Sequence, residues 1–324
     1  MKVCVVTGGA GFIGSHLVRQ LAQDGVRVRV IDNLSSGTLQ NLEGIKGAID
    51  FIRGDIRDPD CLCTVFTGSE VVFHQAALTS VPVSIENPVL TNDINVDGTV
   101  NVLAAAKKCG VKRIIAASSS AVYGNSPVLP KAEELIPQPV SPYAITKYVG
   151  EMYSGFFSQF QGLETVCLRY FNVYGPGQNP KSEYAAVIPL FISLMLDRKR
   201  PSIYGDGKQS RDFVHVHDVV RANLLAASAE RVSGEIFNIA SGTHFSLNQF
   251  VNMLNRILDT QIEPKYELER IGDVKHSCAS IEKARQWLGY VPSISFEEGL
   301  RATAQWYAER INALGRLVVE NGRE

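Results

Sequence analysis

The residues of this chain with the clearest chemical meaning are Tyr143 and Lys147, four positions apart in the segment 141–147. Because i, i+4 neighbours share one face of an α-helix, the two side chains are expected to lie close together. Ser141 suits an N-cap and Pro142 the first helical position, so a helix is predicted to begin here. A free tyrosine has a pKa of about 10, and a nearby ammonium favours the phenolate and lowers that pKa. The pair is therefore predicted to supply a tyrosinate base.

A glycine pattern near the N-terminus predicts a phosphate-binding loop. Gly8, Gly11 and Gly14 follow an apolar run at residues 2–6 and open a helical pattern at 13–23. Between a strand and a helix, glycines let backbone N–H groups approach a pyrophosphate at the helix N-terminus. This context favours a dinucleotide site.

Two aspartates are expected at the ends of the following strands. Asp32 ends the strand predicted at 27–31, and Asp55 follows the strand predicted at 50–53. A carboxylate at Asp32 can accept from the adenosine ribose hydroxyls and would repel a 2′-phosphate, which favours NAD over NADP. Asp55 is placed to contact the adenine.

The elements that position these residues read as an α/β fold. Short β-branched runs alternate with helical patterns, which predicts a Rossmann-type doubly wound parallel sheet. Strands are expected at 2–6, 27–31, 50–53, 71–74, 113–117, 164–169 and 236–239, and helices at 13–23, 91–109 and from 142 onward.

After residue 169, prolines and a Gly-Asp-Gly turn interrupt the alternation of predicted strands and helices. Residues 1–170, with returning segments near 213–240, are predicted to form an NAD-binding domain. Residues 171–212 and 241–324 are predicted to form a smaller, mostly helical substrate-binding lobe.

Composition excludes several classes of protein. The 324 residues carry a formal charge of −1 and no basic run, so no nucleic-acid partner is expected. No run reaches the roughly 18 apolar residues of a spanning helix, and the first apolar run is too short for a signal peptide, so a cytoplasmic protein is expected. The six cysteines form no dense disulfide framework. His215 and His217, with Asp218, lack companion ligands, so no metal is expected.

With these features, the chain resembles the extended short-chain dehydrogenases/reductases, specifically the nucleotide-sugar epimerases. The resemblance reaches to about Tyr290. The matching motifs are Thr7-Gly8-x-x-Gly11-x-x-Gly14, Asp55-Ile56-Arg57-Asp58, His74-x-Ala76-Ala77, Ser118-Ser119-Ser120-Ala121-Val122-Tyr123-Gly124, Tyr143-x-x-x-Lys147, Arg169-Tyr170-Phe171-Asn172, Arg211-Asp212-Phe213-Val214-His215-Val216, Phe237-Asn238-Ile239 and Arg270-x-Gly272-Asp273.

The resemblance implies tightly bound NAD and a UDP-sugar substrate. The residues implied for NAD are Gly8, Gly11, Phe12, Ile13, Gly14, Asp32, Asn33, Asp55, Ile56, Gln75, Ala76, Ala77, Tyr143 and Lys147. Those implied for the substrate are Thr79, Ser119, Ser120, Tyr143, Asn172, Val187, Tyr204, Arg211, Arg270, Asp273 and Ser277.

By the same resemblance the catalytic set is Ser119, Tyr143 and Lys147. Tyr143 takes the proton of the sugar hydroxyl while the C4 hydride moves to NAD⁺, and Ser119 donates to the reacting oxygen. A 4-keto sugar forms, turns over in the site and receives the hydride on its other face. Ser118 and Ser120 flank Ser119, and the choice among the three stays open.

The serine loop distinguishes reactions within the family. Dehydratases carry an acidic pair after the catalytic Ser or Thr, and decarboxylases a Glu two residues before the Tyr-Gly. This chain has Ser120 and Ala121 there, which disfavours both reactions and favours epimerisation. Small residues at Ser277 and Ala186 resemble enzymes that act on UDP-N-acetylglucosamine, so UDP-GlcNAc/UDP-GalNAc interconversion is expected, with UDP-Glc/UDP-Gal as a second activity.

Three alternatives remain. A UDP-glucuronate 4-epimerase would share the same catalytic set. A net oxidoreductase would release NADH. A non-catalytic NAD-binding scaffold would typically lack the tyrosine or the lysine that this chain keeps. The resemblance also predicts a homodimer formed through residues 91–108 and 143–160.

Overall fold

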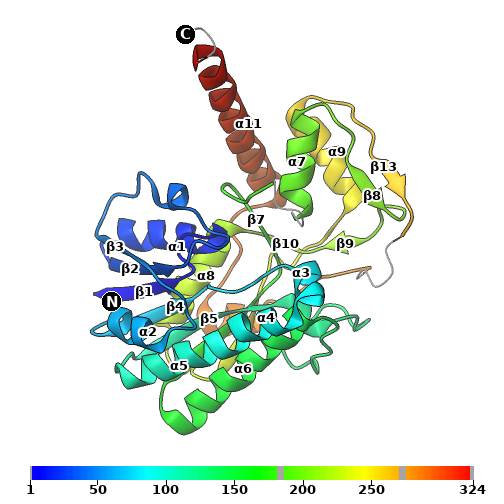
Figure 1. The fold of residues 1–324 in the computed structure, drawn as a ribbon. Helices are drawn as coiled ribbons and strands as arrows, with labels where there is room; N and C mark the ends of the chain where they lie inside the picture. The colour runs from blue at the N-terminus through cyan, green and yellow to red at the C-terminus, as the bar shows by residue number, and fades with distance from the viewer. Residues whose placement is uncertain (1, 181–185, 270–274, 322–324) are drawn as a thin grey trace.

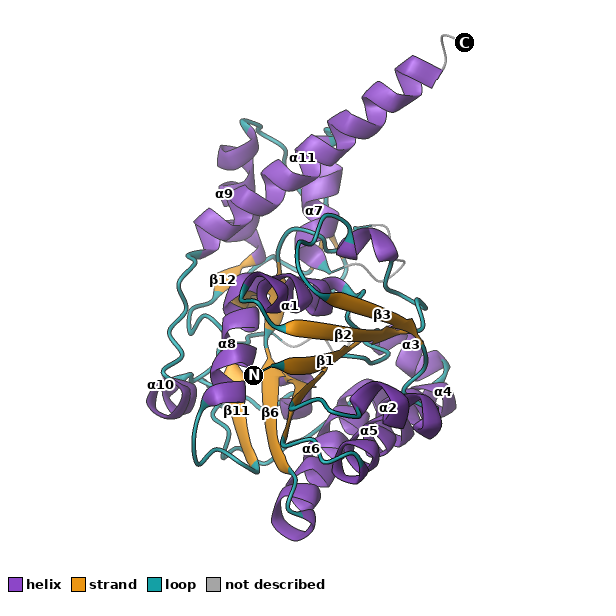
Figure 2. Ribbon diagram, turned by 90° about the vertical axis from the view of Figure 1, so that its left-hand side faces the viewer, coloured by secondary structure: helices purple, strands orange, loops and turns teal. Residues whose placement is uncertain are grey.

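The computed structural model describes residues 2–180, 186–269 and 275–321. Within them, seven strands form one parallel sheet in the order β11-β6-β5-β4-β1-β2-β3 (Figures 1 and 2). Their bounds are β1 Val3–Thr7, β2 Arg27–Asp32, β3 Ile49–Arg53, β4 Val71–His74, β5 Arg113–Ser119, β6 Glu164–Tyr170 and β11 Glu235–Ile239. The chain runs outward from β1 in both directions, which confirms the predicted doubly wound fold. The direction reverses between β1 and β4, the position where such sheets bind ligands.

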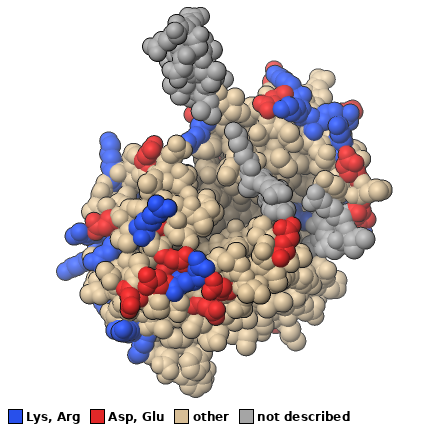
Figure 3. Space-filling view, viewed as in Figure 1, with Lys and Arg blue, Asp and Glu red and all other residues tan. Residues whose placement is uncertain are grey.

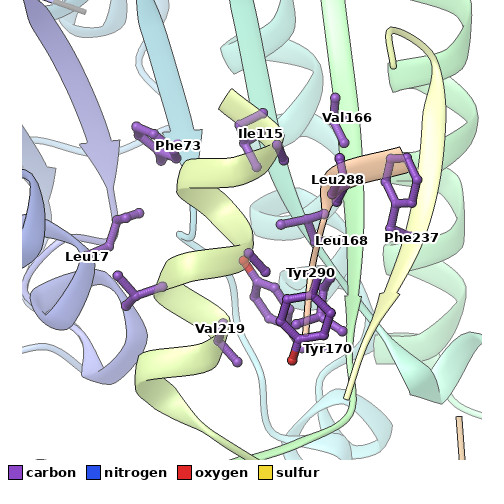
Figure 4. Close-up of a cluster of buried hydrophobic side chains, with 14 of the residues drawn as sticks. Leu17, Phe73, Ile115, Val166, Leu168, Tyr170, Val219, Phe237, Leu288 and Tyr290 are labelled. Carbon is purple, nitrogen blue, oxygen red and sulfur yellow. The ribbon is translucent and has the colours of Figure 1, made fainter. Parts of the chain in front are cut away.

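Helices cover both faces of the sheet, and each face has its own apolar core. Successive side chains of a strand point to opposite faces, so Val6 of β1 joins one core and Val5 the other. The first face carries α1 (Phe12–Gln23), α8 (Val216–Ser228) and α10 (Glu282–Leu288), and the second carries α2 (Pro59–Phe66), α5 (Gly98–Lys108) and α6 (Pro142–Gln161). Figure 4 shows the first core, where Leu17, Val219 and Leu288 approach the sheet from these helices.

The helix predicted at 91–109 is not one regular α-helix. It comprises α4 (Pro88–Asn92), a π-helical turn at Asp93–Asp97 and then α5. The π turn holds Asn95, whose side chain is 3% exposed and turns inward onto the loop after β4. Single π turns are frequent at functional sites. The short helix α2 was not predicted; Asp58 caps it and Pro59 opens it.

The C-terminal lobe packs around a third core of aromatic side chains. Phe213 and Phe296 stack at 5.0 Å between ring centroids, and Phe250 lies against both. The lobe contains α7 Val187–Leu196, α9 Leu247–Leu258 and α11 Phe296–Asn321, with paired short strands β8 Ser202–Tyr204 and β13 Lys265–Glu267, β9 Ser210–Arg211 and β12 Phe245–Ser246, and β7 Asn172–Tyr174 and β10 Phe213–His215. Of the helices described, none has the length and apolar character needed to cross a bilayer.

Candidate active site

The glycine loop joins β1 to α1 and lies tightly against the start of the β4 loop. Gly8 has a φ of +68°, and a Cβ there would lie 2.7 Å from the backbone of Ala76. A Cβ on Gly14 would lie 2.2 Å from the carbonyl oxygen of Gly8. Helix α1 begins at Phe12 with no side-chain cap from Gly11, so its first N–H groups point into the loop. This cradle, which any side chain would fill, fits the pyrophosphate of NAD.

Asp32 supports the same loop from the end of β2. Its Oδ2 accepts a hydrogen bond from Ala10 N at 2.9 Å, and its Oδ1 accepts from Leu34 N at 2.8 Å. The carboxylate is 8% exposed. Each oxygen retains acceptor capacity for a ribose hydroxyl. Asp32 therefore orders the phosphate loop as well as standing where a ribose contact is predicted.

Asp55 lies at the end of the next strand in a polar cluster. Its Oδ2 accepts from Arg57 Nη2 at 2.8 Å and from Asn33 Nδ2 at 2.9 Å. The hydrogen bonds from Arg57, followed by that from Asn33, hold the pKa of the Asp55 carboxyl well below its usual range. Arg57 also bonds Asp93 at 2.7 Å, so this edge of the predicted adenine site is an ionised network. Sequence reasoning missed the partner Asp93, which is distant along the chain.

The loop after β4 is held by side chains from three other elements. Gln75 Nε2 donates to Tyr170 Oη and to Asn223 Oδ1, each at 3.1 Å. Ala76 N donates to Thr7 Oγ1 at 3.3 Å. A cofactor contact by Gln75 stays a prediction, and the structure adds that its side chain ties β4 to β6 and α8.

Of the three adjacent serines, Ser119 is the one beside Tyr143. Ser119 ends β5, and its hydroxyl is near enough to the Tyr143 phenol to lower the pKa of that tyrosine. Ser118 points to the other side of the strand, where its Oγ donates to Glu151 Oε1 at 2.5 Å. Ser120 opens a 3₁₀ turn, Ser120–Tyr123. The geometry thus favours Ser119 as the donor to a reacting oxygen.

The electrostatics of Tyr143 differ from the sequence-based expectation. Burial raises its pKa, and only the hydrogen bond with Ser119 opposes that rise. The Lys147 ammonium donates instead to the Ala117 carbonyl oxygen at 2.9 Å. In this arrangement burial is the largest influence on the Tyr143 pKa and outweighs the lowering that the sequence led us to expect.

Lys147 as a whole is partly buried, and its side chain lines a small internal cavity, so its charge is sensitive to its surroundings. Burial lowers the pKa of Lys147 to about 8, while the acidic groups of Cys167 and Glu151 oppose that change. A lysine with a pKa of about 8 can gain or lose its proton near neutral pH.

A buried polar chain missed by sequence reasoning connects the glycine loop to the catalytic helix. Both ring nitrogens of His74 are hydrogen-bonded. Nδ1 pairs with Thr7 Oγ1 at 2.8 Å, and Nε2 pairs with Thr99 Oγ1 at 3.0 Å. Burial, followed by the charge of Lys147, lowers the pKa of His74 to about 3, so the ring is neutral.

Asn95 continues this chain from the π turn. It accepts from Leu78 N at 2.7 Å and donates to Leu78 O at 2.9 Å and to Thr146 Oγ1 at 3.1 Å. Thr146 in turn donates to Tyr143 O at 2.8 Å. The sequence does contain a pattern that could have indicated this polar chain: Thr91, Asn95 and Thr99 are spaced by four residues, as on one helix face.

Three of the predicted substrate residues, Asn172, Arg211 and Ser277, lie around β9. Asn172 Nδ2 donates to Asp212 O at 2.9 Å, and Ser277 N donates to Ser210 O at 3.0 Å. Arg211 lies between them, with its Nη1 donating to Ser210 O at 3.0 Å. Figure 3 shows the molecule hollowed between the sheet domain and the lobe.

Asp212 holds these segments together from inside the protein. Its carboxylate, fully buried, accepts from Ser241 N and Oγ at 2.8 and 2.7 Å, and from Gly242 N and Ala279 N at 3.1 Å each. It therefore joins the end of β9 to the turn at Ser241 and Gly242 and to the segment that follows Ser277. Sequence reasoning had placed Asp212 in a motif without this role.

The remaining predicted residues are placed as follows. Ile13 and Ala76 pack against the two cores, Ile56 is buried, Ala77 lies in the loop after β4, Thr79 is exposed, Val187 opens α7 and Tyr204 ends β8. Arg270 and Asp273 lie outside the described residues.

Comparisons with known proteins point to one family of enzymes. The model of the NAD-dependent epimerase/dehydratase family matches residues 4–240. A putative UDP-glucose 4-epimerase of Methanocaldococcus jannaschii is 42% identical, over 93% of this chain and 97% of its own length. A UDP-glucuronate 4-epimerase of Thermodesulfobacterium geofontis is 36% identical, over 98% of this chain and 100% of its own length.

Among solved structures, the UDP-N-acetylglucosamine 4-epimerase of Methanobrevibacter ruminantium superposes with a TM-score of 0.91 and 42% identity, over 95% of this chain and 99% of that one. The chain therefore belongs to the NAD-dependent epimerase/dehydratase family.

Proposed function

We propose that this protein is a UDP-sugar 4-epimerase that uses Ser119, Tyr143 and Lys147. The observation that carries the proposal is that Tyr143 and Lys147 share one face of α6 beside the end of β5, where the Lys147 ammonium donates to Ala117 O and Ser119 is the serine that influences the Tyr143 phenol. Ala121 N donates to Ser119 Oγ at 3.1 Å, so Ser120 and Ala121 belong to the same turn that Ser119 caps. Neither is a carboxylic acid, so the loop lacks the group that elimination or decarboxylation would need.

The chain's own residues account for the proton steps. Tyr143 accepts the proton of the C4 hydroxyl and later returns it, with Ser119 donating to the same oxygen. The positive charge of Lys147, one turn further along α6, would favour the phenolate form of Tyr143 against the effect of burial. Bound NAD supplies the hydride acceptor and donor. Because the hydride returns to the sugar, no net oxidation occurs, which is consistent with a retained cofactor.

For the sugar, we favour UDP-GlcNAc/UDP-GalNAc, with UDP-Glc/UDP-Gal as a second pair. The support is the small side chain of Ser277, bonded through its backbone to β9 beside Arg211, and the activity named for the Methanobrevibacter enzyme. The guanidinium of Arg211 suits a diphosphate. The glucuronate 4-epimerase named for the Thermodesulfobacterium relative is the alternative.

A homodimer is part of the proposal. The outer face of α4 and α6 carries large apolar side chains, with Val89 82%, Phe160 65% and Met152 60% exposed. Phe156 and Ile145 extend the same face, at 47% and 48%. Such a contiguous apolar surface is typical of an interface, and a second copy would cover it. Sedimentation as a monomer at micromolar concentration would contradict the dimer.

The deciding experiment incubates purified protein, without added NAD, separately with UDP-GlcNAc, UDP-Glc and UDP-GlcA and resolves the products by NMR. Conversion of UDP-GlcNAc to UDP-GalNAc is expected. Reaction of UDP-Glc or UDP-GlcA alone would keep the mechanism and refute the sugar assignment. Release of NADH would favour the oxidoreductase, and no reaction with NAD supplied would favour the scaffold.

A further inference from the structure

A third ionisable side chain, that of Glu151, lies on α6 in line with Tyr143 and Lys147. Tyr143, Lys147 and Glu151 lie at successive steps of four residues and so share one helix face. Glu151 is 4% exposed, although glutamate is rarely buried without a partner. It has no part in the proton steps described above.

The carboxylate of Glu151 is fixed in place from two strands. Arg169 of β6 donates to it through both Nε and Nη2, each at 2.8 Å, and Ser118 of β5 donates at 2.5 Å. Both members of the ion pair have side chains only 2% exposed. The guanidinium also lies 4.8 Å from the centre of the Tyr123 ring. Glu151 therefore cannot turn away from Lys147 without breaking a buried bidentate pair.

Glu151 and Lys147 line the same small internal cavity. Its volume is about 20 Å³, room for about one water molecule, and its other polar walls include His74, Thr99 and Asn95. Neither a direct ion pair nor a hydrogen bond joins Glu151 to Lys147 in the described part of the chain. The carboxylate thus acts on the ammonium across the cavity, in surroundings that screen charge poorly.

The other ionisable groups around Lys147 do not supply negative charge. Tyr143 is a phenol with a raised pKa, and His74 is neutral. Cys167 of β6 would oppose loss of the lysine proton only as a thiolate, and burial raises the pKa of this thiol to about 12, so it is uncharged at neutral pH. Arg169 is positive and does not line the cavity. Glu151 is therefore the anionic group that opposes the loss of the lysine proton.

We propose that Glu151 is a positioning residue for Lys147: its clamped carboxylate keeps the buried ammonium charged at the pH of catalysis. Arg169 and Ser118 act through Glu151 by fixing the carboxylate. The consequence for turnover rests on the proposed function, but the charge of Lys147 can be measured without substrate.

The test follows the ε-carbon NMR signal of Lys147 against pH in NAD-bound protein labelled at lysine. The signal is assigned by its absence in Lys147→Met. Glu151→Gln keeps the shape of the side chain and removes its charge, so the Lys147 midpoint should fall by about one pH unit. Glu164→Gln, which removes the exposed carboxylate paired with Arg113, is the matched control and should leave the midpoint unchanged.

An unchanged midpoint in folded Glu151→Gln would overturn the proposal. If that variant does not fold, the double variant Glu151→Gln/Arg169→Met removes both charges together, and the midpoint should still fall because only the carboxylate lines the cavity. A wild-type midpoint below about 7 would by itself refute the proposal, since Lys147 would then be uncharged at neutral pH.

Turnover gives an independent reading. With a UDP-sugar that the wild type converts, the alkaline limb of the kcat profile should move to lower pH in Glu151→Gln. A merely structural role would reduce the folded fraction and lower kcat equally at every pH. If the wild type converts no UDP-sugar, the proposed function fails while the NMR titration still decides the role of Glu151.

Discussion

The cofactor region and the substrate lobe are assembled in different ways. In the cofactor region, the glycine loop, Asp32 and Asp55 lie at or just beyond the ends of neighbouring strands and contact adjacent loops, as Asp32 contacts Ala10 and Asp55 contacts Asn33. In the lobe, Asn172, Arg211 and Ser277 come from three distant segments that meet only because Asp212 and β9 bond them. Motifs therefore determine the first region locally, whereas the second depends on long-range packing. Substitutions should damage the two regions in different ways.

The largest expected loss of activity comes from substituting Tyr143, which is predicted to contact both the cofactor and the substrate. Tyr143→Phe removes the hydroxyl that accepts and returns the proton, so kcat should fall by at least about 100-fold. The ring remains, so folding and NAD content should stay close to wild type. The check is turnover of the best UDP-sugar beside the bound NAD released on denaturation. Near wild-type turnover would refute the role of Tyr143.

The next largest effect is expected for a substitution in the cofactor region, where NAD binding should be lost. In Gly14→Ala the new Cβ would lie 2.2 Å from the Gly8 carbonyl oxygen, so the loop must shift, at a cost of roughly 1–3 kcal/mol. NAD retention should be lost, as measured by the cofactor that co-purifies. Gly155→Ala is the control, because a Cβ there meets no atom within 4 Å. Equal NAD content in the two variants would show that the loop tolerates side chains.

A substitution in the lobe should change selectivity and spare the cofactor. Ser277→Tyr adds bulk beside β9, so kcat/KM for UDP-GlcNAc should fall by roughly 10-fold or more relative to UDP-Glc. NAD content should not change. Both substrates are measured on one preparation, so each serves as the control for the other. An unaltered ratio would remove Ser277 from the sugar pocket.

The smallest effect concerns the ionised cluster at Asp55. Its pKa is lower in the folded protein than in the unfolded chain, so it stabilises the fold above the unfolded pKa of about 4, and this contribution is lost as pH falls through the folded pKa. The difference in unfolding free energy between wild type and Asp55→Asn should therefore shrink as pH drops below about 4. Since the cluster is partly exposed, salt should reduce the difference as well. A difference independent of pH would contradict the pairing.

Much of the fold could be read from local patterns. The alternation of β-branched runs and helical patterns predicted the doubly wound sheet, because burying both faces of a parallel sheet demands it. The π turn around Asn95 could not be read, since it depends on the partner loop at Leu78. The short strands β7, β8 and β9 were also missed, because two or three residues carry too little pattern.

The sequence by itself determined the residue types on which the site depends: the glycines at the end of β1, the aspartates that follow, and Tyr143 and Lys147 on one helix face. These are short-range properties of strands, turns and helices. Only the tertiary structure decided that Ser119 and not Ser118 meets Tyr143, that Lys147 bonds Ala117, and that Glu151 is clamped by Arg169. Those outcomes depend on which strands are neighbours and how deeply each group is buried, and burial and charge proximity arise only when distant segments pack together.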